Sequence, residues 1–141
     1  SNAVYRGRDR QGRPFSVTAG SAVQTTAQDT HVSMTELLAS IALDDGPAQI
    51  SAPEGIYDFD SDRVRVDGPV LVSAPGGYRL SARGVSIDMR SRRVTGSGGI
   101  EGAIPAGTFS ANTISADLVE RTVALDGNAR LRMAPGKLRM P

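Results

Sequence analysis

The chain contains 141 residues, of which 16 are basic and 15 acidic, so that the formal net charge is +1, and it contains no cysteine. This balance excludes a general nucleic-acid binder, whose domain would be strongly basic, and the lack of cysteine excludes disulfides and thiolate metal sites. No run of about 18 apolar residues is present, so this sequence contains no transmembrane helix. Ser1-Asn2-Ala3 matches the scar left by tag removal, and a single domain is predicted over residues 4–141.

Alternation of apolar and polar residues predicts β-strands along most of the chain. The alternating stretches are residues 15–19, 63–67, 70–72, 78–82, 85–89, 122–125 and 129–133. Between them lie glycine-containing breaks, including Asp-Gly pairs whose glycine can take the positive φ of a hairpin turn. Residues 34–43, MTELLASIAL, have helix propensity, but the end of this segment has the same pattern as residues 121–127. We therefore predict a strand here as well.

A motif beginning near Ser-Ala, passing through an acidic residue and ending in a Val-rich stretch closed by Gly recurs along the chain. Its anchor alanines are Ala19, Ala52, Ala82 and Ala111, at spacings of 33, 30 and 29 residues. Each unit predicts two strands and two turns, and such a unit cannot bury its apolar face alone. The copies are therefore expected to curl around a shared interior, which indicates an all-β roll or sandwich.

Residues that could support catalysis or bind metal are few. His31 is the sole histidine, whereas zinc needs three or four ligands and a general base needs a positioned partner, so His31 is predicted to be a surface residue. Asp58, Asp60 and Asp62 alternate as on a strand face or in a turn, and no EF-hand spacing follows them. Residues 96–99, GSGG, precede no helix and no Lys-Ser/Thr pair, which indicates a turn rather than a phosphate loop. We predict no catalytic residue, no metal site and no cofactor.

The apolar residues of the strands would line one face of a rolled sheet. They form a core if the roll closes, and a groove for acyl chains if it stays open, with about 0.8 kcal/mol gained for each buried methylene. Between Arg79 and Arg93 lie five arginines and one aspartate, which could bind phosphates at the rim of such a groove. The residues predicted to line the groove are Phe15, Val17, Val64, Val66, Leu80, Ile87, Phe109, Val123 and Leu125.

Three features resemble a known family. They are the opening YRGRDRQGRPFSVTA (residues 5–19), the phrase ISAPEGIYD (residues 50–58) and the Leu-Asp-Gly strand ends. Nearly the whole chain from Val4 is similar to the lipopolysaccharide export proteins of the LptC type, within the OstA-like group that also includes the periplasmic bridge protein LptA. The resemblance implies an all-β fold, a single open, twisted, boat-shaped β-jellyroll of about fifteen short antiparallel strands. It also implies a non-enzymatic function, in which lipopolysaccharide from the inner-membrane LptBFG transporter passes to LptA through an apolar groove.

The resemblance further implies docking between sheet edges. Phe15, Val17 and Ala19 would face the transporter, and Leu131 and Met133 would face LptA; a homodimer is a further association that such edges allow. The expected location is the periplasm, with an inner-membrane anchor helix upstream. Two alternatives stay open: an LptA-like bridge protein, and a self-assembling β-solenoid scaffold, whose interior would be packed shut.

Overall fold

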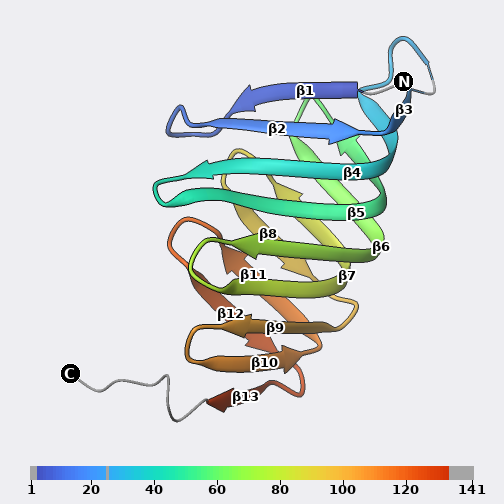
Figure 1. Cartoon of the computed structure of the whole chain (residues 1–141). Coiled ribbons are helices and arrows are strands. Elements are labelled where there is room, and N and C mark those ends of the chain that lie inside the picture. The colour runs from blue at the N-terminus through green and yellow to red at the C-terminus, as the bar shows by residue number, and fades with distance from the viewer. Residues whose placement is uncertain (1–2, 25, 134–141) are drawn as a thin grey trace.

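The alternating stretches of the sequence form antiparallel strands in the computed structural model, which describes residues 3–24 and 26–133 (Figure 1). The strands are β1 (Ala3–Arg8), β2 (Pro14–Ala19), β3 (Ser21–Gln24), β4 (His31–Leu43), β5 (Gly46–Asp58), β6 (Arg63–Ala74), β7 (Tyr78–Asp88), β8 (Arg93–Gly96), β9 (Ile100–Ile104), β10 (Gly107–Ala111), β11 (Thr113–Asp117), β12 (Thr122–Asp126) and β13 (Arg130–Met133). They belong to one sheet, and no membrane-spanning helix is found among these residues. The predicted all-β class is confirmed, and residues 34–43 lie in strand β4 rather than in a helix.

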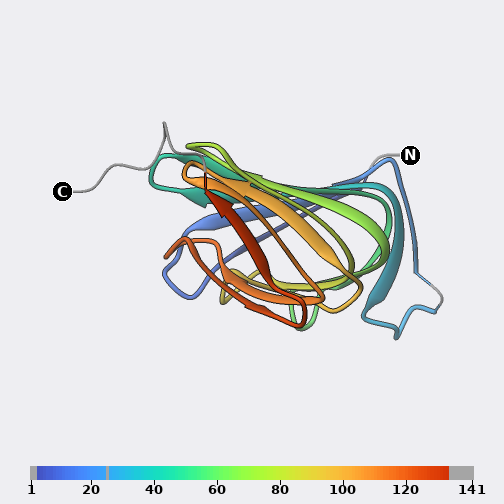
Figure 2. The same cartoon turned by 90° about the horizontal axis from the view of Figure 1, so that it is seen from below.

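The sheet folds over itself into two layers, which run from β1 at the top of Figure 1 to β13 at the bottom. The first layer contains β1, β2, β9, β10 and β13, and the second contains β3, β8, β11 and β12. Strands β4 to β7 run through both layers. Seen along the stack, curved corners join the two layers on one side (Figure 2).

The corners are made by bulges instead of hairpin turns, and this explains why four strands are longer than the sequence suggested. The register shifts between Ser51 and Ile56 in β5 and between Val66 and Pro69 in β6. Glu36 in β4 and Gly84 in β7 take positive φ values of 52° and 63°. A bulge bends and twists a strand without ending it, so β4 and β5 each continue for 13 residues.

The repeated alanines line these corners. Each ends its first-layer segment, and all four are buried. Three of them pair with large residues across the sheet, since Leu37 pairs with Ala52, Val70 pairs with Ala82, and Ile100 pairs with both Ala82 and Ala111. A large side chain from each returning strand therefore meets a small one from its neighbour, which lets the two layers approach closely where they join.

The acidic residue of the repeat builds the turns at the other end of the second layer. Asp58, Asp88 and Asp117 each accept hydrogen bonds from the backbone N–H groups two and three residues later. Successive turns are joined by backbone bonds from Met89 N–H to Asp62 O and from Leu118 N–H to Arg92 O, both 3.0 Å. The copies that begin at Ala52, Ala82 and Ala111 therefore each encode one corner and one capped turn.

Candidate functional site

The interior between the layers is packed at the N-terminal end of the stack. Of the residues predicted to line a groove, Val17, Val64, Val66 and Ile87 are completely buried and Phe15 is nearly so. They touch one another across the layers as a continuous core. Native packing density leaves no room for an acyl chain here, so in this structure these five residues form core rather than groove.

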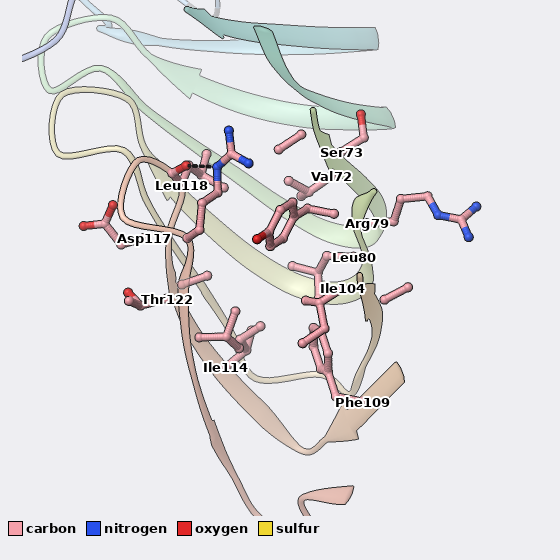
Figure 3. A pocket seen from close by; sticks show the side chains of 16 residues that line it. Val72, Ser73, Arg79, Leu80, Ile104, Phe109, Ile114, Asp117, Leu118 and Thr122 are labelled. Atoms are coloured by element: carbon pink, nitrogen blue, oxygen red, sulfur yellow. Dashed lines mark hydrogen bonds between the residues drawn. The ribbon is translucent and has the colours of Figure 1, made fainter. Parts of the chain in front are cut away.

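A cavity opens between the layers towards the C-terminal end (Figure 3). Its volume is about 50 Å³, and its exposed lining is mostly apolar. Of the predicted groove residues, Leu80, Phe109 and Val123 line it, and Leu125 packs against the core, partly buried. The lining also includes Val72, Tyr78, Ile104, Ile114, Leu118 and Arg121. The cavity has room for a few water-sized groups, so a hydrocarbon chain can enter only if the layers part.

The C-terminal end of the interior is uncovered in the described part of the chain. Val123 pairs with Ala116, and Leu131 pairs with Phe109, so both side chains share the inward face of their buried partners. They are nevertheless 41% and 59% exposed, and Met133 is 39% exposed, because no described strand lies beyond β12 or β13. An apolar face thus continues from the cavity to the end of the stack.

The Phe109 ring is held in the cavity wall by a close contact with Gly102, its partner on β9. A Cβ atom at Gly102 would lie 2.2 Å from Phe109 Cζ, so only glycine leaves room for the ring. Phe15 covers Gly7 in the same way at the other end of the first layer. The ring of Phe109 therefore has a defined place at the inner end of the exposed apolar face.

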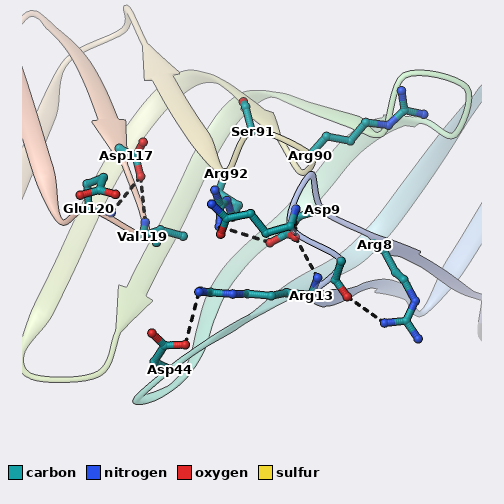
Figure 4. Close-up of polar contacts among 12 residues, drawn as sticks. Arg8, Asp9, Arg13, Asp44, Arg90, Ser91, Arg92, Asp117, Val119 and Glu120 are labelled. Carbon is teal, nitrogen blue, oxygen red and sulfur yellow. Dashed lines mark hydrogen bonds and ion pairs between the residues drawn. The ribbon is translucent and has the colours of Figure 1, made fainter.

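Two arginines tie the layers together on the side opposite the corners. Arg92 Nη1 donates to Gln11 Oε1 (2.8 Å) and lies 3.4 Å from Asp9 Oδ2, in a pair whose side chains are only 10% and 0% exposed (Figure 4). Asp9 Oδ1 accepts bonds from the N–H groups of Gln11 and Arg13, both 2.9 Å. The turn between β1 and β2 is thereby fastened to the turn between β7 and β8.

Arg121 makes the second connection, beside the cavity. Its Nη1 donates to Pro75 O (2.9 Å) and its Nη2 to Asp45 Oδ1 (2.7 Å). Its guanidinium also lies over the Tyr78 ring, 4.9 Å from the centroid. Arg121 thereby joins the turn between β11 and β12 to two turns of the first layer, the β4–β5 turn and the β6–β7 turn, beside the cavity.

The arginines from Arg79 to Arg93 do not gather at the cavity. Arg79 points away from the other lining side chains (Figure 3), and Arg92 is engaged with Asp9. Arg90 Nε donates to Asp62 Oδ2 (2.8 Å), and this bond together with the charge of Asp62 raises the pKa of Arg90. Two arginines line the cavity in this structure, Arg79 from the predicted cluster and Arg121 from outside it.

Three further titratable groups, Tyr57, Asp58 and His31, contact neighbouring side chains or backbone groups. Burial, followed by a 2.7 Å hydrogen bond to Asp62, raises the pKa of Tyr57. Burial alone would raise the pKa of Asp58, but the hydrogen bonds that it accepts outweigh burial and hold this pKa below its usual range. His31 is exposed, with ring nitrogens 3.1 Å from Asp29 and 3.4 Å from Asp58. Over residues 3–24 and 26–133, no three His, Asp or Glu side chains form a metal-binding group.

The edge strands lie partly where the sequence placed them. Phe15, Val17 and Ala19 are on β2, but β1 pairs along the outer side of β2, so the N-terminal edge of the first layer is β1. The alternation of β1, AVYRGR, is blurred because apolar Val4 is exposed and Gly7 lies on the inward face against Phe15. Leu131 and Met133 lie on β13, which pairs with β10 alone among the described strands.

The sequence-based groove list lacked several cavity residues, among them Arg121 and Tyr78. A signal for Arg121 was present, because it occupies the same turn position as Arg92, and both have positive φ, 59° and 62°. The partners of Arg121 could not be inferred, since Asp45 lies 76 residues away in the sequence.

Comparisons with known proteins bear on the fold. No family model matches the chain, and a search of curated proteins finds no match either. A solved structure from Pseudomonas aeruginosa is similar: LptH, described as the LptA-homologous periplasmic component of the conserved lipopolysaccharide transport device. The TM-score is 0.69 at 14% sequence identity, over 92% of this chain and 100% of that chain. At this identity the likeness shows that the chain has the open antiparallel β-jellyroll fold of that protein.

Proposed function

We propose that this chain is a non-enzymatic component of lipopolysaccharide transport, and that it carries acyl chains along the apolar face between its two layers. The observation that carries the proposal is the uncovered C-terminal interior, where inward-facing Val123, Leu131 and Met133 are exposed next to the cavity. Each acyl methylene buried there would contribute about 0.8 kcal/mol, so several chains would bind tightly without a catalytic group. The fold shared with LptH supports the same function.

Binding of acyl chains between the layers requires the layers to move apart. The cavity of about 50 Å³ is too narrow for acyl chains, and the corners are packed, so the layers must separate on the side held by Arg92 and Arg121. On this side the layers are joined by the side-chain bonds of these two arginines and by a backbone bond from Arg10 N–H to Arg90 O (3.1 Å), whereas at the corners continuous strands join them. Opening therefore starts at the C-terminal end, where the described strands leave the interior uncovered.

The proposed location is the periplasm, and the proposed partners follow from the edges. In an LptC-type protein β1 would dock on the LptBFG transporter and β13 on LptA, and an N-terminal helix would anchor the protein to the inner membrane. In an LptA-like bridge, both edges would join other jellyrolls, copies of this chain included. Crosslinking in cells from Arg6 on β1 and Arg132 on β13 distinguishes the two, because a transporter adduct at Arg6 is expected for the LptC type alone.

Photo-crosslinking with purified lipopolysaccharide tests whether lipid binds in the interior between the layers. A benzoylphenylalanine at Phe109 or Leu131 should form a lipid adduct, because both side chains face the interior. The same residue at Thr108 or Arg132, the adjacent outward-facing positions, is the matched control. Adducts that are equally strong at inward and outward positions, or absent from both, would contradict an interior lipid path.

A scaffold function is the second candidate, and the packed N-terminal interior favours it. A solenoid of stacked units buries a closed core and grows through its free edges. Absence of lipid adducts together with concentration-dependent filaments in light scattering would support the scaffold and overturn the carrier.

A further inference from the structure

Arg121 lies in the wall of the cavity and also spans the gap between the layers. Its Nε donates to Leu118 O in its own turn (3.0 Å), while Nη1 and Nη2 reach Pro75 and Asp45 in turns of the first layer. The Arg121 side chain lines the apolar cavity, and its guanidinium lies over the Tyr78 ring. A cation is therefore held where a hydrocarbon chain in the cavity would meet the solvent.

Of the three hydrogen bonds that the Arg121 side chain donates, the bond to Asp45 is the easiest for a ligand to replace. Asp45 is 56% exposed on a short turn, whereas Arg121 is 19% exposed and fixed by two backbone carbonyls. An ion pair with an exposed carboxylate contributes little, because solvent screens it and both side chains lose freedom. A guanidinium offers five N–H donors in a planar fork, and Arg121 uses three of them in these bonds. A phosphate has more acceptor oxygens than a carboxylate and up to two negative charges. It can therefore compete with the Asp45 carboxylate for the guanidinium of Arg121.

We propose that Arg121 is a head-group site, which binds the phosphate of an amphiphile whose hydrocarbon chain enters the cavity beside Phe109 and Ile104. The phosphate takes the place of the Asp45 carboxylate, and the Tyr78 ring keeps the guanidinium in position. This inference rests on the proposed function for the hydrocarbon chain. It adds the head-group chemistry and the residue that recognises it.

The exchange couples recognition to opening. Asp45 belongs to a turn of the first layer and Arg121 to a turn of the second, so losing their bond removes one connection between the layers. A phosphate bound to Arg121 thus weakens the connection between the layers beside the cavity, where the hydrocarbon chain of the same amphiphile must enter. A neutral amphiphile leaves the connection intact and meets a cavity of about 50 Å³.

Calorimetric titration with dodecyl phosphate and with dodecyl glucoside, both below their micelle concentrations, tests the proposal. The wild-type chain should bind the phosphate about 10- to 100-fold more tightly, the range expected for hydrogen bonds to a charged group. Arg121→Gln should remove most of this preference and change glucoside affinity much less. Arg121→Lys should keep part of it, because lysine is a point charge without the fork. Urea unfolding of each variant verifies that it is folded.

Asp45→Asn and Asp44→Asn form the matched pair, since the two aspartates are neighbours in one turn and only Asp45 contacts Arg121. Asp45→Asn should raise the affinity for dodecyl phosphate by about 3- to 10-fold, because the competing carboxylate is gone, and Asp44→Asn should leave it unchanged. Equal affinities in the two variants, or a phosphate preference that survives in Arg121→Gln, would make Arg121 a purely structural connection.

The outcomes also separate this inference from the proposed function. If lipid adducts form at Phe109 but the chain shows no preference for dodecyl phosphate, the lipid-carrier function stands and the head-group site at Arg121 is wrong. If inorganic phosphate binds as tightly as dodecyl phosphate, Arg121 is a simple anion site and the proposal of an amphiphile ligand is wrong. Failure of both amphiphiles to bind, with no adduct at Phe109, overturns both proposals.

Discussion

The buried pair of Asp9 and Arg92 allows a sharp test of how the layers are held together. Asp9→Asn keeps an oxygen for the backbone bonds from Gln11 and Arg13 but removes the charge opposite Arg92. Arg92 then stays buried with Gln11 as its remaining side-chain acceptor. Removing one partner of a buried ion pair costs about 3–5 kcal/mol, and the partial exposure of Arg92 places our expectation at about 3 kcal/mol.

Urea unfolding followed by far-UV circular dichroism measures this change. A loss of about 3 kcal/mol corresponds to a midpoint lower by roughly 1–3 M urea at the slopes usual for small domains. Asp44→Asn is the control, because Asp44 is 90% exposed and its contact with Arg13 is 3.4 Å long, and its midpoint should not move.

A double-mutant cycle separates the pair from the rest of the turn. Asp9 Oδ2 and Arg92 Nε make no hydrogen bond in the described structure, so the pair is imperfectly satisfied. Asp9→Asn combined with Arg92→Met should therefore lose less stability than the sum of the two single changes, with a coupling of about 2 kcal/mol. Additive losses, or an Asp9→Asn midpoint equal to that of Asp44→Asn, would refute the idea that this pair fastens the layers.

Three further predictions concern the corner, the cavity wall and the capped turns. Ala82→Leu should lower the free energy of unfolding by about 1–3 kcal/mol in urea titrations, because the corner leaves no space for a larger side chain, whereas Ser81→Leu on the outward face should change it little. Gly102→Ala should displace the Phe109 ring and cost a similar amount, and an unchanged aromatic NMR spectrum would argue against the contact. The pKa of Asp58 is lower in the folded state than its unfolded value of about 3.9, so its contribution to stability is complete above that pH and is lost as pH falls through the folded pKa. Asp58→Asn should therefore flatten the fall in unfolding free energy between about pH 5 and pH 2, and an unaltered slope would exclude this carboxylate as a cause.

Local patterns determined the class of fold. Alternation along residues 63–66 and 85–88 reflects strands with one buried face, and this depends only on neighbours two positions apart. The alanine repeat likewise indicated equivalent strand pairs, because the copies at Ala52, Ala82 and Ala111 each form a corner and a capped turn. The same local reasoning identified residues 34–43 as strand, although their helix propensity pointed the other way.

Only the tertiary structure decided which inward-facing residues are core and which line the cavity. Val64 and Leu80 have the same alternation in sequence, yet Val64 is sealed beneath neighbouring strands and Leu80 borders the cavity. The difference arises from their position in the stack, because the C-terminal strands have fewer strands beyond them to cover the interior. The connection from Arg121 to Asp45 likewise spans 76 residues and exists because the folded sheet brings the two turns together. Strand periodicity acts over a few residues, whereas closure of the interior depends on contacts between distant segments, and the sequence pattern contains no record of these.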